Sequence, residues 1–254
     1  MTESEGKRRR WARSTQIVDA TVKGVDKGAN LLYGSVVGET RVPLTLAIIA
    51  AIALQLLLPK SVVVIHERWL LPTLQGLLLV ALIVGNPWRI TRESRVIRVL
   101  GLGLLGAIAF NDFVGIGRMV DLLVSDHPST NLTGRDLIRV AVVIWLTNVI
   151  VFALAYFELD QGGPFKRLHG EGRADFLFPQ QTDDLREKWA GWRPTFVDYL
   201  FLSFTNSTAF SPTDTMPLSG WAKMLMLLQS GSALVTIGVV AARAVNILAG
   251  GPPA

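Results

Sequence analysis

The residues of this chain best suited to chemistry are hydroxyl and carboxyl groups placed between apolar segments. Residues 203–223, SFTNSTAFSPTDTMPLSGWAK, form a Ser- and Thr-rich stretch with two prolines, and apolar runs precede and follow it. Hydroxyl oxygens together with one carboxylate suit a hydrated cation. The stretch therefore predicts a cation path, whose pore-lining or filter-like candidates are Thr205, Ser207, Thr208, Ser211, Pro212, Thr213 and Asp214.

A second group of polar residues lies inside the apolar runs: Asn111, Asp112, Arg118, Asn148 and Gln229. An ionisable side chain that faces lipid is costly, so Asp112 and Arg118 are expected to face protein or water, or to lie near the membrane surface. For Arg118 two alternatives stay open, a pair with Asp121 three residues later or a reach toward the interface. Asp112, Asn148 and Gln229 would together give a small transporter its site.

The sequence contains no motif typical of catalysis, nucleotide binding or metal binding. It holds no Ser/His/Asp order, no HExxH, no phosphate-binding glycine loop and no GxGxxG after a strand, so we expect no enzyme and no cofactor. There is no cysteine, which excludes disulfides and thiolate metal sites. The three histidines, His66, His127 and His169, are too widely separated to predict a metal site.

The elements that must position these residues are predicted to be membrane helices. Half of the residues are hydrophobic and 18% are charged, which predicts an all-α, polytopic membrane helix bundle with five or six hydrophobic segments. Residues 1–41 form a basic tail, with an interfacial helix as an alternative, and residues 42–136 hold three transmembrane helices. Residues 137–254 form the last region. Whether residues 195–211 cross the membrane or re-enter it stays open.

The basic residues predict an orientation. If the N-terminus is cytoplasmic, nineteen of the 25 Lys and Arg residues fall on that side, as the positive-inside rule requires. The side of the 158–194 loop stays open, because its basic residues are offset by Asp and Glu. The positive charge thus indicates a membrane surface, and we expect no nucleic-acid partner.

Residues 145–248 resemble the two-span pore module of potassium-channel-type proteins. The order that carries the resemblance is Phe196, Asp198, Leu200, Ser203, Thr205, Thr208, Asp214, Pro217, Leu218, Ala222, Leu225 and Arg243. It implies an outer helix at 137–157, a loop at 158–194, a pore-like helix and turn at 195–219, an inner helix at 220–248, and a tetramer. The filter differs, since TAFSPTD at 208–214 has no glycine. Because carbonyl filters rely on glycine, a weakly selective cation channel is expected rather than a potassium-selective one.

The same region is similar to bacterial membrane proteins of the DUF1345 type. The shared positions are Gly162, Gly163, Phe178, Pro179, Asp198, Tyr199, Phe201, Ser203, Phe204, Thr205, Thr213, Asp214 and the AVN at 244–246. This resemblance implies a multi-pass protein of the bacterial inner membrane and names no activity.

Three functions remain open at this point. They are a weakly selective cation channel, a non-conducting structural or scaffolding membrane protein, and a small transporter that uses Asp112. The expected partners are the lipid bilayer, monovalent cations and further copies of the chain.

Overall fold

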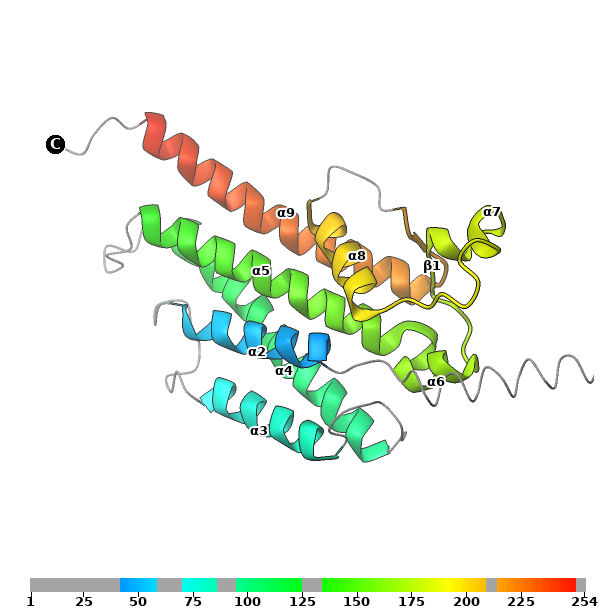
Figure 1. Cartoon of the computed structure of the whole chain (residues 1–254). Helices are drawn as coiled ribbons and strands as arrows, with labels where there is room; N and C mark the ends of the chain where they lie inside the picture. The colour runs from blue at the N-terminus through cyan, green and yellow to red at the C-terminus, as the bar shows by residue number, and fades with distance from the viewer. Residues whose placement is uncertain (1–41, 59–69, 86–94, 125–133, 209–213, 250–254) are drawn as a thin grey trace, which may run out of the picture.

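The computed structural model describes residues 42–58, 70–85, 95–124, 134–208 and 214–249, so the predicted basic tail lies outside it. Within these ranges the protein is mostly helical, which confirms the all-α prediction (Figure 1). The principal helices are α2 (Val42–Leu56), α3 (Leu70–Gly85), α4 (Arg95–Val124), α5 (Gly134–Leu159), α8 (Phe196–Thr208) and α9 (Gly220–Ala249).

Three of these helices are long and apolar enough to cross a membrane. The candidate spans are Arg98–Asp121, Ile138–Gly162 and Gly220–Ala242. The described parts of α2 and α3 are also apolar, with 15 and 16 residues. At 1.5 Å per residue they measure about 23 Å, which is less than a hydrocarbon core of about 30 Å. The chain is thus a membrane protein by the length and composition of its described helices, three of which are candidate spans.

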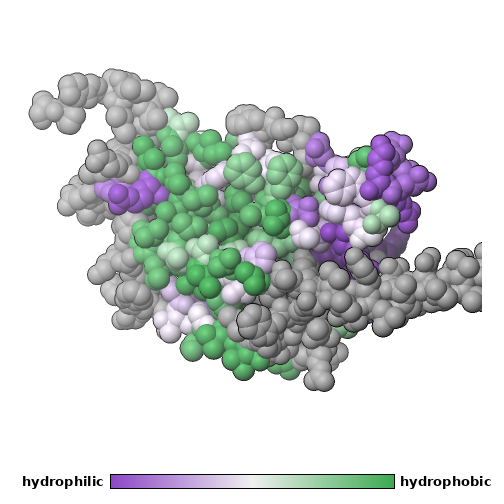
Figure 2. Space-filling model, viewed as in Figure 1, coloured by the Kyte–Doolittle hydropathy of each residue, from purple (hydrophilic) through white to green (hydrophobic). Residues whose placement is uncertain are grey.

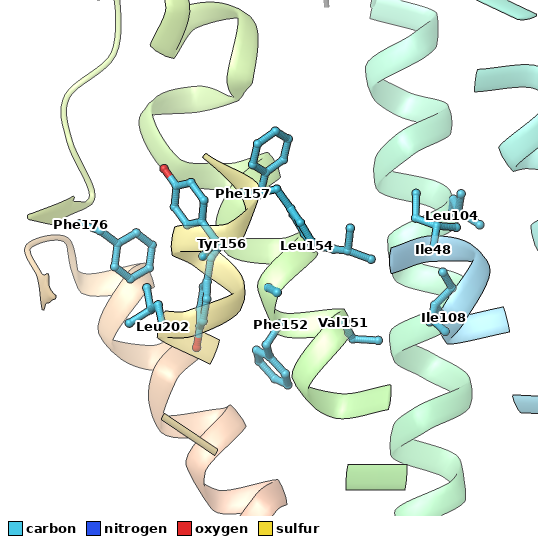
Figure 3. Close-up of a cluster of buried hydrophobic side chains, with 14 of the residues drawn as sticks. Ile48, Leu104, Ile108, Val151, Phe152, Leu154, Tyr156, Phe157, Phe176 and Leu202 are labelled. Atoms are coloured by element: carbon cyan, nitrogen blue, oxygen red, sulfur yellow. The ribbon is translucent and has the colours of Figure 1, made fainter. Parts of the chain in front are cut away.

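Helix α5 lies at the centre of the bundle and packs against α2, α4, α8 and α9. Its apolar residues point in several directions, because a helix surrounded by others needs no polar face. Figure 3 shows Val151 and Leu154 of α5 near Ile48 of α2 and Leu104 of α4, while Tyr156 and Phe157 turn toward the α8 side. The core therefore runs along both sides of α5.

The central helix α5 runs in the opposite direction to α2, α4 and α9 (Figure 1). We call the end of the bundle where α5 ends and α9 begins the loop end, and the opposite end the far end. The Arg98 guanidinium carbon, near the start of α4, would lie 3.8 Å from a Cβ placed on Gly163. The start of α4 and the segment after α5 therefore both lie at the loop end. Arg98 of α4 is thus on the same side of the bundle as Lys166 and Arg167.

The segment between α5 and α8 folds into short elements at the loop end. These are η1 (Asp160–Gly162), α6 (Pro164–His169), β1 (Phe176–Leu177), η2 (Pro179–Gln181) and α7 (Asp183–Arg186). Strand β1 pairs antiparallel with β2 (Met216–Pro217), with Phe176 opposite Pro217. This pair fixes the chain just before α9 beside the chain that follows α6. Figure 2 shows hydrophilic residues at this end and a hydrophobic middle.

The exposed surface of α8 and α9 is largely apolar. Their exposed side chains include Val197, Phe201, Phe204, Met224, Leu227, Leu228 and Leu234. In water such a surface would be unfavourable, whereas hydrocarbon accepts it at no cost. The distribution of exposed residues thus agrees with the membrane assignment.

Candidate functional site

Asp112 lies inside the helix bundle, where α4, α5 and α9 meet. Its side chain is 4% exposed. The Asn148 amide of α5 donates to Asp112 Oδ2 at 3.4 Å and to Ser232 Oγ of α9 at 2.8 Å. Ser232 Oγ in turn donates to the Gln229 carbonyl at 2.8 Å. We call Asp112, Asn148 and Ser232 the three-helix site.

Apolar residues enclose this site along α4. Ile108 lies one turn before Asp112 and Ile116 one turn after it, and both are buried. Gly115 brings α4 close to α5, since a Cβ placed there would lie 3.6 Å from Ile144 Cδ1. Close packing of this kind is what small residues permit between membrane helices. The carboxyl group of Asp112 is therefore held in an apolar layer, away from both ends of the bundle.

Among the described side chains, no basic group is recorded as a partner of Asp112. In the described part of the chain its one recorded hydrogen-bond partner is the neutral Asn148 amide. Arg118 and Asp121, further along α4, are both exposed, and Asn111 is half-buried. A lone carboxylate in apolar surroundings is strongly unfavourable, so a positive ion or a proton must accompany it. The arrangement can therefore take up a cation.

Gln229 is the centre of a second buried network, between α8 and α9. Its amide nitrogen donates to the Ser203 carbonyl, Ser203 Oγ and Ser207 Oγ at 2.6–2.9 Å. Its carbonyl oxygen accepts from Tyr156 and from Asn206 at 2.5 and 2.9 Å. We call these residues the Gln229 network. Because every polar atom of Gln229 is paired, the network holds α8 firmly against α5 and α9.

The predicted pore-lining hydroxyls are engaged within the protein. Ser207 belongs to the Gln229 network. The Thr205 hydroxyl donates to carbonyls of its own helix, at Phe201 and Leu202, and the Thr208 hydroxyl donates to the Thr205 carbonyl. Asp214 is exposed at the loop end. The predicted filter residues Ser211, Pro212 and Thr213 lie outside the described residues.

Helix α8 starts where its sequence provides a cap. Thr195 precedes it, and its backbone N–H and hydroxyl both donate to Asp198 Oδ2, at 2.7 and 2.8 Å. This is one half of a capping box, in which an acidic residue three positions into the helix pairs with an end N–H group. Pro194, just before Thr195, cannot extend the helix backwards without loss of a hydrogen bond. The start of α8 is thus encoded locally.

Helices α8 and α9 run parallel from the loop end. Tyr199, in the first turn of α8, donates to Asp160, and Trp221, in the first turn of α9, donates to Asp175. Further along, Asn206 of α8 donates to the Met226 carbonyl of α9 at 3.0 Å. Helix α8 has 13 residues and is therefore about 20 Å long. After it, strand β2 pairs with β1, so the chain lies at the loop end again before α9 begins.

A polar cluster at the loop end was not predicted from the sequence. Asp160 is fully buried and accepts from the Tyr199 hydroxyl and from the Asp175 backbone N–H. Arg167 donates to the Phe157 and Asp160 carbonyls at the end of α5 and lies over the Phe157 and Tyr199 rings. These residues fix the start of α8 and α9 on α5. A sequence signal existed only in Gly162 and Gly163, which mark the turn after α5.

Among the residues that the structure describes, no three His, Cys, Asp or Glu side chains gather in a way that could hold a metal ion. Compared with family models, curated proteins and solved structures, the chain matches none of them. The resemblances to pore modules and to DUF1345-type proteins therefore stay expectations, and function must be argued from the site.

Proposed function

We propose that this chain is an integral membrane protein that moves a small monovalent cation, either a proton or an alkali ion, through the three-helix site. The observation that carries the proposal is the buried carboxyl group of Asp112, which lies within a candidate span and has an amide as its partner. Ionisable groups at such depth are costly, and they are found where protons or ions bind.

Two features of the site support transport rather than a merely structural carboxylate. Asn148 and Ser232 come from two further helices, so the site lies at the contact of three elements that could move relative to one another. The apolar layers at Ile108 and Ile116 separate the site from both ends. Alternating access requires a site of this kind, closed on each side and opened by a shift of helices.

The test is cation flux through the purified full chain in liposomes. A proton or sodium gradient is applied, and internal pH and sodium are followed with fluorescent dyes. We expect wild-type protein to dissipate one of these gradients and Asp112→Asn to abolish the flux. Asp121→Asn is the matched control, because it removes an exposed carboxylate from the same helix. Equal flux through both variants would refute a role for Asp112.

A cation channel is the second candidate, and the parallel course of α8 and α9 favours it. A short helix that enters from one end and is followed by a span has the arrangement expected of a pore helix and inner helix. In a tetramer the turn that contains Asp214 would line the path. In that case Asp214→Asn should change the potassium-to-sodium permeability ratio while Asp112→Asn leaves it unchanged.

A non-conducting scaffold is the third candidate, and the fully paired Gln229 network favours it, because such bonds hold helices together without a ligand. Absence of flux from correctly folded protein would support it. On the basis of the resemblances we also infer a bacterial inner-membrane location with a cytoplasmic N-terminus. The basic residues shared by the start of α4 and the 160–195 segment support this orientation.

A further inference from the structure

We infer that the three-helix site binds a dehydrated alkali cation of sodium size through the side-chain oxygens of Asp112, Asn148 and Ser232. This inference deepens the proposed function and rests on it, since it names the ion and the ligands. Asn148 is 1% exposed, and within the described part of the chain its amide oxygen has no hydrogen-bond partner.

Such an unpaired oxygen is costly, because it loses its bonds to water and gains none from the protein. The two ends of a carboxamide have nearly the same shape. A half turn of the amide group would place the oxygen where the nitrogen now lies, between Asp112 and Ser232, and the NH2 group in the unpaired position, so only a bound cation would favour this rotated state. This rotated state would set three oxygens from three helices around one point. Without a cation the oxygens would repel one another, whereas with a cation each would be a ligand.

The spacing suits one ion. The Asn148 amide nitrogen lies 3.4 Å from Asp112 Oδ2 and 2.8 Å from Ser232 Oγ. For oxygens about 2.4 Å from an ion, a separation of about 3.4 Å corresponds to an angle of about 90° at the ion, as for the Asp112 distance, and a separation of about 2.8 Å corresponds to about 70°, as for the Ser232 distance. Sodium and calcium have nearly the same radius, so the same spacing applies to sodium. A larger ion such as potassium would need the three helices to separate further.

The charge of the site distinguishes a monovalent ion from a divalent one. Asp112 supplies one negative charge, and the recorded partners that surround it are neutral. One alkali cation would neutralise the site, while a calcium or magnesium ion would leave a net charge buried in an apolar layer. The described residues also lack the cluster of carboxylates that divalent ions favour.

Binding is tested by thermal unfolding of the purified full chain in detergent, at constant ionic strength, with sodium, lithium, potassium or choline chloride. We expect the midpoint to rise with sodium or lithium concentration and to stay constant in potassium and choline. A ligand that binds only the folded state produces such a concentration-dependent shift. Ser232→Ala should raise the sodium concentration for the half-maximal shift about tenfold or more.

Two further variants keep the test specific. Ser232→Thr retains the hydroxyl and should restore the sodium shift. Thr236→Ala removes a buried hydroxyl one turn further on α9, which bonds the Ser232 carbonyl of its own helix, and should leave the shift intact. Equal shifts in all four salts, or a sodium shift that Ser232→Ala does not alter, would overturn the inference.

The two proposals fail in different ways. Proton flux that depends on Asp112, without any sodium shift, would refute the alkali-ion site and leave cation transport standing. A sodium shift that Ser232→Ala removes, in a protein without flux, would support the site and refute transport. Neither flux nor shift would refute both.

Discussion

Two buried glutamines offer a matched test of how polar groups stabilise this bundle. Gln229 and Gln75 are both fully buried, on α9 and α3 respectively. The side chain of Gln229 has five polar contacts, of which its two N–H groups and its oxygen can satisfy four at one time, whereas in the described part of the chain neither side-chain polar atom of Gln75 has a partner. Leucine has nearly the volume of glutamine, so Gln→Leu at each position changes polarity with little change in packing.

The structure predicts opposite effects. Hydrogen bonds between membrane helices average about 0.6 kcal/mol each, so the loss of four lowers the free energy of unfolding by about 2.4 kcal/mol in Gln229→Leu. The hydroxyls of Tyr156 and Ser207 would lose their recorded bonds to the glutamine amide. Gln75→Leu removes an unpaired amide, so unfolding should cost the same or about 1 kcal/mol more.

The assay is reversible unfolding of the full chain in mixed detergent micelles, with helicity followed by circular dichroism. Both variants are compared with wild type in one preparation. Equal destabilisation by the two substitutions would refute the reasoning, because it would mean that the recorded bonds of Gln229 contribute nothing beyond the presence of a buried glutamine.

Three further predictions concern the loop end and the course of the chain. Tyr199→Phe should lower the free energy of unfolding by about 1–3 kcal/mol, because the buried Asp160 loses a hydrogen-bond donor; an unchanged value in the same unfolding assay would contradict this role. Gly172→Ala should destabilise the protein more than Gly170→Ala, because a Cβ at position 172 would lie 2.0 Å from the Gln161 carbonyl oxygen. A Cβ at position 170 would meet open space, and the positive φ of that residue would add a strain of about 1 kcal/mol. The melting temperatures of the two alanine variants decide that comparison. Because the chain has no cysteine, Lys188→Cys and Asp214→Cys can be labelled with an impermeant maleimide in sealed vesicles, and both should react from the same side, with Asp121→Cys reacting from the other. Labelling of Lys188→Cys and Asp214→Cys from opposite sides would mean that residues 195–211 cross the membrane.

Composition and apolar run length were enough to predict a helical membrane protein, because the bilayer imposes both the length of a span and its hydrophobicity. The start of α8 could also be predicted, since Pro194, Thr195 and Asp198 act on the backbone next to them. Such features depend on neighbours in the sequence and need no knowledge of the tertiary structure.

The partners of the buried polar residues could not be predicted in the same way. Asn148 and Asp112 are 36 positions apart, and their contact depends on how α4 and α5 rotate and cross. The sequence did not indicate Ser232 as a site residue, because a serine within an apolar helix commonly bonds the backbone of its own helix, as the nearby Thr236 does. The bonds of the Thr205, Ser207 and Thr208 hydroxyls to their own helix or to the Gln229 network could not be predicted either, and the pore that these hydroxyls predict stays a prediction.

Flux in liposomes, measured for Asp112→Asn and Asp214→Asn side by side, decides whether a cation moves through the site at Asp112. Proton, sodium and potassium gradients are applied to each variant and to wild type. We expect Asp112→Asn to stop the flux and Asp214→Asn, which changes an exposed residue at the loop end, to preserve both its rate and its selectivity. Full flux through Asp112→Asn with altered selectivity in Asp214→Asn would instead place the path at the turn after α8.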